Sequence, residues 1–502
     1  MVNCNKYLAI KHLKETYLNF ITKNPLFKYV FKSILFVFLF ANISCNKSIE
    51  DSEDLNFFEN KIETGQLPYI SVKSDEMIQN EPKVPGDIYI KENDSITHSS
   101  PIGVEYRGST SFRLTDKKSY GFEIWDENNE DSEMEILNFP EEEDWILMGH
   151  VFRSSDQRVF DPSLMHHYIG YELSRSIGMY ASRSKFVELE VNGDYKGVYI
   201  LMEKLKRDKN RIDIKKLKEE DITGGYILKI DKTAGGDVIE GSQPLSYFEN
   251  NWDDDAKYSE SISFRSDYDI NGVQISFPPF NPPYHPAQYL ETYFLYEYPK
   301  ADDITDEQKQ YIQNYIRDFE NSLFNIDNTA SDRDYNNYID IDSFVDYFLL
   351  NELTGNIDAY RLSTYMHKNR GGKLKMGPIW DLNIGYNRQD RVPFTDWIAN
   401  YNQYVPRDAW MVPFWWEVFL GDNYFKQRLK ERWTQYRSNQ FSNQTILNLV
   451  QETADYLIEN GSIDRNYQRW IGISIDYLQV IDALKSHLHD RLLWMDQKIN
   501  SM

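Results

Sequence analysis

Cysteine is scarce in this sequence. The 502 residues contain two, Cys4 and Cys45, and the nine histidines are scattered. Two cysteines exclude a disulfide-rich scaffold, and the lack of clustered cysteine and histidine argues against a structural zinc site. The strings G-x-S-x-G and H-E-x-x-H are also absent, which argues against serine hydrolases of the α/β type and zinc proteases. Any chemistry therefore has to come from other side chains.

Positive charge is also in short supply. The sequence has 55 Lys and Arg against 79 Asp and Glu, a formal net charge of −24. A strongly acidic chain repels phosphate backbones, so we expect no nucleic-acid partner. A bound nucleotide would need a local basic pocket or a metal ion. Apolar residues make up 41% and aromatic residues 15% of the sequence, which is enough for a sizeable core.

A short hydrophobic run covers residues 34–41, ILFVFLFA. Eight residues are too few for a stable membrane span. The run follows a lysine-rich stretch and leads to Asn42-Ile43-Ser44-Cys45, which resembles a lipobox, although Asn42 replaces the usual aliphatic residue. We predict a lipoprotein signal peptide over 1–44 and lipidation of Cys45. An ordinary secretory signal or an uncleaved anchor is the alternative.

An acidic, polar stretch follows Cys45, and we expect residues 45–66 to form a tether. A lipid on Cys45 would make the protein a membrane lipoprotein of the cell envelope. The acidic stretch is consistent with display at the cell surface.

The pattern after residue 67 changes from strand-like to helix-like. Asn192-Gly193 separates two alternating runs, which predicts a β-hairpin. From residue 305 onward the apolar spacing is helical. This order predicts an α+β fold with one domain over 67–502, a loop insertion at about 234–300 and a helical C-terminal part over 400–502. The predicted strands cover 69–72, 86–90, 104–108, 118–124, 186–191, 197–202 and 225–230, and the predicted helices cover 163–177, 305–325, 342–355, 415–437, 443–459 and 475–499.

Three stretches carry residues suited to phosphate or metal chemistry. Lys117 and Lys118 follow a turn rich in small residues, where a basic side chain can hold phosphates; two solvated lysines are the alternative. Asp358 follows a predicted helix end and could accept a proton, although such an aspartate more often caps the next element. Asp381 and Asn383 follow an apolar strand and could both reach one Mg²⁺, with turn formation as the alternative.

The order of these stretches, lysine then aspartate then aspartate, is the order of phosphate clamp, base and metal ligand in protein kinases. The usual kinase strings G-x-G-x-x-G, HRD and DFG are absent. Residues 107–387 nevertheless resemble the CotH kinase family, named after spore coat protein H. The matching landmarks are Arg107-Gly108-Ser109-Thr110-Ser111, Lys117-Lys118-Ser119-Tyr120, Asp144-Trp145-Ile146-Leu147, Asp161-Pro162-Ser163-Leu164-Met165, Phe186-Val187-Glu188-Leu189, Asn192-Gly193-Asp194-Tyr195-Lys196-Gly197-Val198-Tyr199, Glu203-Lys204, Asn356-Ile357-Asp358 and Trp380-Asp381-Leu382-Asn383.

The resemblance implies a fold similar to atypical protein kinases, ATP with Mg²⁺ or Mn²⁺ as cofactors, and a Ser or Thr hydroxyl of an exported protein as the phosphoryl acceptor. It assigns nucleotide or phosphate binding to Lys118 or Lys117 and to Glu203, the catalytic base to Asp358, and metal binding to Asp381 and Asn383.

Two positions depart from the family pattern. His166-His167 stands where many members have Arg-Asn, and Asn383 stands where many have Asp, which removes one negative charge from the metal site. An adjacent histidine pair on a helix is more typical of packing or of the surface than of a metal site.

Three functional hypotheses remain open. The first is an exported lipoprotein kinase. The second is an inactive, pseudokinase-like lipoprotein that binds or assembles partners through the aromatic segment 277–298. The third is a metal-dependent hydrolase that uses Asp358 and Asp381. The kinase hypothesis requires Lys118, Asp358 and Asp381 to meet in one pocket.

Overall fold

The computed structural model describes residues 66–93, 95–108, 110–233, 258–280, 287–326, 332–386, 391–470 and 475–502. The predicted signal peptide, Cys45 and nearly all of the acidic tether lie outside these residues. The chain divides into two units, 1–57 and 58–502, and all described residues belong to the second. Within the described ranges, no helix is both long and apolar enough to span a membrane.

Seven strands of the N-terminal part form a closed barrel in the order β1-β2-β3-β4-β5-β9-β8. Neighbouring strands are antiparallel except β1 and β8, which pair in parallel and close the barrel. Alternate residues of each strand fill the interior, as the two-residue period of a strand requires. In β9, Tyr199 and Leu201 belong to the barrel core, whereas Val198 and Ile200 belong to the core outside it. The strands are β1 (Tyr69–Lys73), β2 (Val84–Glu92), β3 (Ser95–Arg107), β4 (Ser119–Ile124), β5 (Asp144–Met148), β8 (Ser184–Val191) and β9 (Asp194–Glu203).

The predicted hairpin is confirmed as β8 and β9. Asn192 and Gly193 have φ angles of 51° and 78°, as a tight turn with two left-handed residues requires. Between β3 and β8 the chain also forms α3 (Thr110–Leu114), the short pair β6 (Phe152–Arg153) and β7 (Arg158–Val159), and α4 (His166–Ser176). Helix α4 begins three residues later than predicted, because Asp161 accepts hydrogen bonds from Ser163 and from the N–H of His166 and so fixes a turn before it.

A five-stranded sheet with the order β11-β12-β10-β13-β14 forms the second β element. Its strands are β10 (Tyr226–Ile230), β11 (Ser263–Arg265), β12 (Tyr293–Tyr298), β13 (Thr364–Lys368) and β14 (Leu374–Met376), all antiparallel to their neighbours. The prediction of a loop over 234–300 is therefore too broad. It contains β11, which has three residues, and β12, whose sequence YFLYEY does not alternate and follows the proline-rich run 277–283.

Helices make up most of the chain after residue 305, which confirms the predicted α+β order. They are α6 (Asp306–Ser322), α7 (Ile341–Thr354), α8 (Tyr401–Tyr404), α9 (Trp415–Gly421), α10 (Asn423–Arg437), α11 (Asn443–Glu459), α12 (Ser462–Arg469) and α13 (Tyr477–Asn500), with the 3₁₀ turns η3 (Asp334–Asn337) and η4 (Ile398–Asn400); the turn η2 (Gln288–Leu290) precedes β12. Side chains cap the first turns of α6 and α7: Thr305 and Gln308 form a capping box on α6, and Asp340 caps α7.

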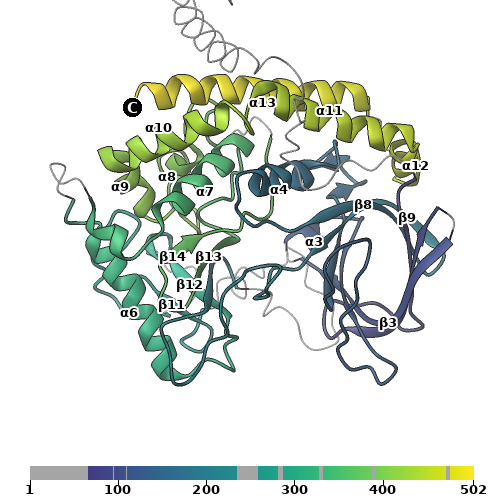
Figure 1. The fold of residues 1–502 in the computed structure, drawn as a ribbon, viewed down its shortest axis with the longest axis horizontal. Coiled ribbons are helices and arrows are strands. Elements are labelled where there is room, and N and C mark those ends of the chain that lie inside the picture. Colours follow the sequence, from purple (N-terminus) through teal and green to yellow (C-terminus); the bar gives the residue numbers. More distant parts are fainter. Residues whose placement is uncertain are drawn as a thin grey trace, which may run out of the picture. The chain divides into compact units, whose positions relative to one another are not determined.

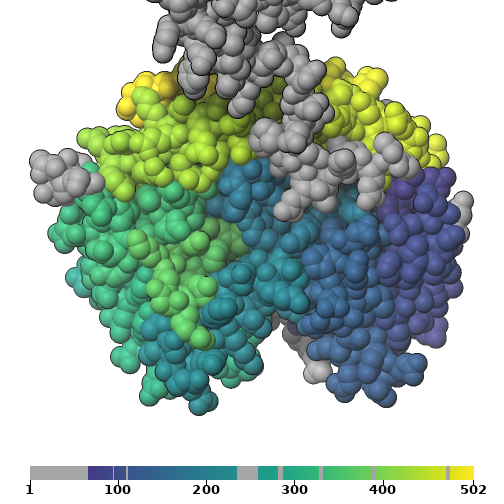
Figure 2. All heavy atoms as spheres, viewed as in Figure 1, coloured from purple at the N-terminus to yellow at the C-terminus, as the bar shows by residue number. Residues whose placement is uncertain are grey.

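Helix α7 lies at the centre of this helical part. It contacts α10 and α13 on one side and α4 on another, as Figure 1 shows. Eleven of its residues are buried, and the helix ends at Gly355, whose φ of 60° is the usual left-handed helix end. The loop that carries Asp358 therefore starts from a rigid, fully packed support. Figure 2 shows a notch between the blue surface of the barrel part and the teal surface near residue 220.

Candidate active site

Two neighbouring strands bring Asp231 and Ser363 together. β10 and β13 are antiparallel with Ile230 opposite Thr364, so Asp231, which follows β10, lies beside Ser363, which precedes β13. The Ser363 hydroxyl lies 3.2 Å from Asp231 Oδ2 although the two residues are 132 positions apart. Strand pairing thus creates a contact that no local pattern in the sequence predicts.

The same hydroxyl contacts Asp381. After β14 the chain turns back toward the start of β13, and Ser363 Oγ donates to Asp381 Oδ2 at 2.7 Å. A hydroxyl has one proton and can donate to only one of two carboxylates at a time. Asp231 and Asp381 therefore face a shared point with fewer protons than acceptors.

The backbone around this point adopts sparsely populated conformations. Tyr360, Ser363 and Asp381 have φ angles of 72°, 45° and 51°, in the left-handed region that non-glycine residues seldom enter. Such conformations persist only where the surroundings hold them, and they are frequent at functional sites. Here Asn356 Nδ2 donates to the carbonyl of Trp380 at 3.3 Å, which ties the loop after α7 to the segment that ends at Asp381.

Asp381 carries an unusually unfavourable charge. Burial raises the pKa of its carboxyl group, and the charges of Asp231 and Asp358 raise it further, whereas the Ser363 hydrogen bond and Arg107 lower it. Within the described part of the chain no lysine, arginine or histidine forms an ion pair with Asp381. A cation at this position would relieve the repulsion between the carboxylates.

Asp358 lies on the loop that follows α7, with 27% of its side chain exposed. Its Oδ1 accepts from Arg361 Nη2 at 2.5 Å. The loop is attached to α7, because the hydroxyl of Tyr360 donates to Glu352 Oε1 at 2.9 Å. Asp358 and Asp381, which the sequence assigned to base and metal ligand, therefore lie close enough for the charge of one to act on the other.

The basic side chains beside these carboxylates are Lys229 and Arg107. Lys229 Nζ lies 3.5 Å from Asp231 Oδ2 and 3.7 Å from Glu297 Oε2 of the neighbouring strand β12. Burial lowers the pKa of Lys229, but Tyr365, Glu297, Asp231 and Asp381 outweigh it, so the pKa is raised and the ammonium is retained.

Arg107 ends β3, and its guanidinium lies 5.7 Å from the ring centre of Trp380, next to Asp381. The sequence analysis included Arg107 only as a landmark and did not select Lys229 or Asp231. The signal that could have found them is Lys229-Ile230-Asp231 at the end of a predicted strand, where residues two apart share a face.

The two lysines predicted to clamp phosphates have other partners. Lys117 is fully buried, and its Nζ donates to the carbonyl of Val198 at 2.5 Å and to Asn466 Oδ1 at 2.8 Å. Burial lowers its pKa well below the usual range. Lys118 Nζ donates to the carbonyl of Phe112 at 2.6 Å and lies 4.0 Å from the centre of that ring. No contact joins either amine to Asp358 or Asp381, so the meeting of Lys118 with these carboxylates that the kinase hypothesis requires finds no support in the contacts. Lys229 and Arg107 are the basic residues beside the carboxylates instead, and a phosphate-binding role for Lys117 or Lys118 stays a prediction.

Glu203 is also engaged elsewhere. It ends β9, is buried, and accepts from Arg183 Nη1 at 2.6 Å and from the hydroxyl of Tyr180 at 3.1 Å. These contacts hold the end of the barrel, and a nucleotide-binding role stays a prediction.

The positions that depart from the family pattern lie next to each other. His166 and His167 are buried in α4, and burial lowers the pKa of His167 to about 4. His166 Nδ1 is 3.4 Å from the backbone carbonyl of Asn383. In the described ranges the Asn383 side chain has no hydrogen-bond partner, so its role as a metal ligand is neither supported nor opposed by contacts.

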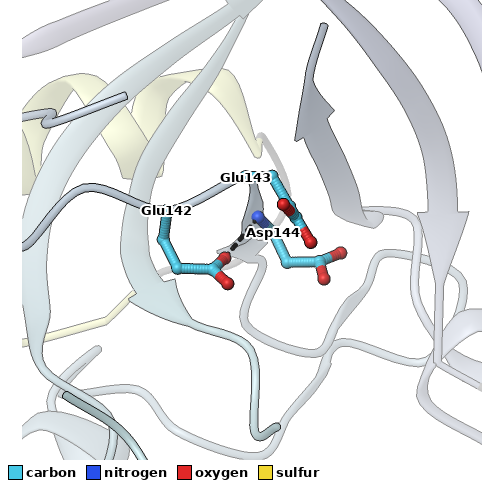
Figure 3. Close-up of side chains that lie close together, drawn as sticks. All are labelled: Glu142, Glu143 and Asp144. Atoms are coloured by element: carbon cyan, nitrogen blue, oxygen red, sulfur yellow. Dashed lines mark hydrogen bonds between the residues drawn. The ribbon is translucent and has the colours of Figure 1, made fainter. Parts of the chain in front are cut away.

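A second acidic cluster consists of Glu142, Glu143 and Asp144 at the start of β5 (Figure 3). Their carboxylate oxygens lie within 4.8 Å of one another. Lys206 Nζ contacts all three at 2.7–3.0 Å, Lys204 contacts Asp144, and Arg211 contacts Glu142. Although burial raises it, the pKa of Asp144 falls to about 2 because Lys204 and Lys206 outweigh burial. This cluster is already neutralised by its own cations.

The two carboxylates near Ser363 match the chemistry of a divalent metal bound together with ATP. Mg²⁺ and Mn²⁺ prefer oxygen ligands, usually one or two carboxylates with phosphate and water completing the shell. Asp381 offers such an oxygen without a competing ion pair among the described residues, and Arg107 and Lys229 supply positive charge nearby for phosphate groups.

Comparison with known proteins identifies the family of the chain. The family described as CotH kinase protein matches residues 104–495, a span that includes β10, α7, and the strands β13 and β14 that precede Asp381. No curated protein matches the chain. The match covers most of the sequence and all the residues of the candidate site, and the chain therefore belongs to the CotH kinase protein family.

Proposed function

We propose that this protein is an atypical protein kinase that transfers the γ-phosphoryl group of ATP to a Ser or Thr hydroxyl of an exported protein. The observation that carries the proposal is the hydrogen bond from Asn356 to the carbonyl of Trp380, which ties the loop of Asp358 to the segment of Asp381. Asp358 follows the central helix and Asp381 follows the β13–β14 hairpin, in the order of base and metal ligand in protein kinases.

The site residues would divide the work as follows. ATP would supply the transferable phosphoryl group, and Mg²⁺ or Mn²⁺, held by Asp381, would neutralise phosphate charge. Arg107 and Lys229 direct positive charge toward the phosphates. Asp358 would accept the proton of the acceptor hydroxyl, and the oxygen of that hydroxyl would bond to the γ-phosphorus of ATP. The bond from that phosphorus to the bridging oxygen breaks, and its electron pair leaves with ADP.

An inactive binding or assembly protein is the second candidate. Two observations favour it: Arg361 pairs with Asp358, and residue 383 is an amide instead of a carboxylate. The predicted binding segment 277–298 favours it less, because its aromatic rings pack on their own surroundings. Phe280 lies 5.7 Å from Tyr293 between ring centres, and Arg265 lies 5.1 Å from the centre of the Phe277 ring.

We also propose that the protein is anchored in the cell envelope by a lipid on Cys45. The lipobox-like sequence and the acidic stretch after it support this location. Mass spectrometry of the N-terminal peptide from membranes tests it: we expect a diacylated or triacylated Cys45, and a Cys45→Ser variant in the soluble fraction. An unmodified N-terminus upstream of Cys45 would contradict the anchor.

Calorimetric titration of ATP with Mn²⁺ into the purified full chain tests the nucleotide-binding step. We expect metal-dependent binding that weakens about tenfold or more in Asp381→Asn, because one of few charged ligands is lost. Asp455→Asn, an exposed aspartate on α11, is the matched control and should bind like wild type. No binding at millimolar nucleotide would rule out catalysis and favour the binding protein.

A further inference from the structure

Asp231 has a fixed orientation that points one oxygen at Ser363, whose hydroxyl also contacts Asp381. Its Oδ1 accepts from the N–H of Lys232 at 2.9 Å, and its backbone carbonyl accepts from the hydroxyl of Tyr258 at 2.7 Å. Its Oδ2 is left to face Ser363 and Lys229. The carboxylate is therefore held in place before any ligand arrives, as a metal ligand should be.

We propose that Asp231, and not Asn383, is the second protein ligand of the divalent cation held by Asp381. The inference rests on the proposed function, since the cation arrives with ATP. Asp231 Oδ2 and Asp381 Oδ2 both lie within hydrogen-bonding distance of the Ser363 hydroxyl, at 3.2 and 2.7 Å. One proton serves two acceptors there, and Lys229 pairs with Asp231 but not with Asp381, so a divalent cation held by both carboxylates would supply the positive charge that Asp381 lacks.

The charge of the site supports Asp231 over Asn383. An amide oxygen carries no net charge, so a site built from Asp381 and Asn383 would have a single negative ligand. Asp231 restores a second negative ligand from a different strand. The backbone carbonyl of Asn383 lies 3.4 Å from His166 Nδ1, whereas Asp231 Oδ2 shares the Ser363 hydroxyl with Asp381 Oδ2.

Lys229 acts as a positioning residue for Asp231. It sits two residues earlier on the same face of β10 and is itself fixed by Glu297 of β12. Its ammonium balances Asp231 when no cation is bound. With cation and nucleotide bound, the same ammonium, still paired with Glu297, would be available to a phosphate group. Lys229→Met should therefore weaken nucleotide binding more than binding of the metal to the nucleotide complex.

A cysteine substitution makes the ligand visible without an activity assay. Cys4 and Cys45 are the sole cysteines of the sequence, so a Cys4→Ser/Cys45→Ser background leaves none. Asp231→Cys in this full-length background places one thiolate at the proposed ligand position, and Asn383→Cys places one at the rival position. Thiolates bind soft cations such as Cd²⁺ strongly, and the bond gives an ultraviolet charge-transfer band.

We expect the band in Asp231→Cys with Cd²⁺ and a non-hydrolysable ATP analogue, and none in Asn383→Cys. The band should be lost when Asp381→Asn is added. Mn²⁺ binding to the nucleotide complex, followed by electron paramagnetic resonance, should weaken about tenfold in Asp231→Asn and change little in Asn383→Ala. Melting curves in EDTA confirm that each variant is folded, and Asp231→Glu, which keeps the charge, should retain part of the Mn²⁺ affinity.

A band in Asn383→Cys alone, or wild-type Mn²⁺ affinity in Asp231→Asn beside a loss in Asp381→Asn, would overturn the assignment while leaving the kinase intact. Absence of any Mn²⁺–nucleotide complex with the wild-type chain would overturn both this inference and the proposed function. The two failures are thus distinguishable.

Discussion

Replacing Arg491 by Met should destabilise the protein and disturb the loop of Asp358. Arg491 lies on α13 and is 2% exposed, and its Nη2 contacts Glu352 Oε2 at 2.9 Å. Glu352 is fully buried on α7 and also accepts from the N–H groups of Ile398 and Ala399, at 2.7 and 3.0 Å. The hydroxyl of Tyr360 is its remaining donor, so this buried carboxylate joins the C-terminal helix to the loop that carries the proposed base.

The magnitude follows from the burial of the pair. Removing one partner of a buried ion pair typically costs about 3–5 kcal/mol, because the other charge stays behind uncompensated. Glu352 should then take up a proton, since burial already raises its pKa and Arg491 is the largest opposing influence. Unfolding entropy scales to about 1 kcal/mol/K for a unit of this size, so Tm should fall by roughly 3–5 °C if the unit unfolds in one step.

Differential scanning calorimetry of the variant measures this shift. Arg428→Met is the matched control, because Arg428 forms a half-exposed ion pair with Asp342 and its loss should cost about 1 kcal/mol or less. The double variant Glu352→Gln/Arg491→Met removes both charges and should be less destabilised than Arg491→Met alone. A Tm for Arg491→Met no lower than that of Arg428→Met would refute the reasoning.

Two further predictions concern single ionisable groups. Burial raises the pKa of Glu320 to about 8 against 4.5 in an exposed chain. Between these values only the folded state holds the proton, so the free energy of unfolding should fall as pH rises from about 5 to 8. Urea titrations should show this fall in the wild-type chain and a flatter pH dependence in Glu320→Gln. An unchanged pH dependence in the variant would contradict the assignment. Lys117→Met should leave ATP affinity unchanged, because the Lys117 amine already donates to the carbonyl of Val198 and to Asn466. Lys229→Met should weaken ATP binding about tenfold. Titration calorimetry of the two variants side by side decides this, and the reverse order would restore Lys117 as a phosphate ligand.

Local patterns in the sequence predicted the elements well where the pattern was long or the turn was specific. The hairpin around Asn192-Gly193 and the helices α7, α11 and α13 lie within a few residues of their predicted bounds. Strand β11 was missed because three residues give too little periodicity, and β12 was missed because its sequence YFLYEY is a nearly continuous aromatic and apolar run without alternation. Their pairing with β10 depends on long-range contacts that a single sequence does not contain.

The candidate site was predicted in part for the same reason. Asp358 and Asp381 each follow a recognisable helix or strand, and the structure places them near each other. Asp231 could not be linked to Asp381 from the sequence, because the link is the register of β10 on β13 across 132 residues. Lys117 was a plausible surface lysine in its local context. Its amine donates to Val198 and Asn466, 81 and 349 residues further along the chain, and the sequence alone does not contain these long-range contacts.

The most direct test of the account is phosphate incorporation into the protein itself. The full chain, Asp358→Asn and Asp381→Asn are incubated with ATP and Mn²⁺, and intact mass spectrometry counts the added phosphoryl groups. The account predicts added phosphate on Ser or Thr in the wild-type chain and none in either variant, with all three still folded by circular dichroism. Incorporation by Asp358→Asn at the wild-type rate would contradict the role of Asp358 as the base, and the absence of incorporation by the wild-type chain would contradict the kinase.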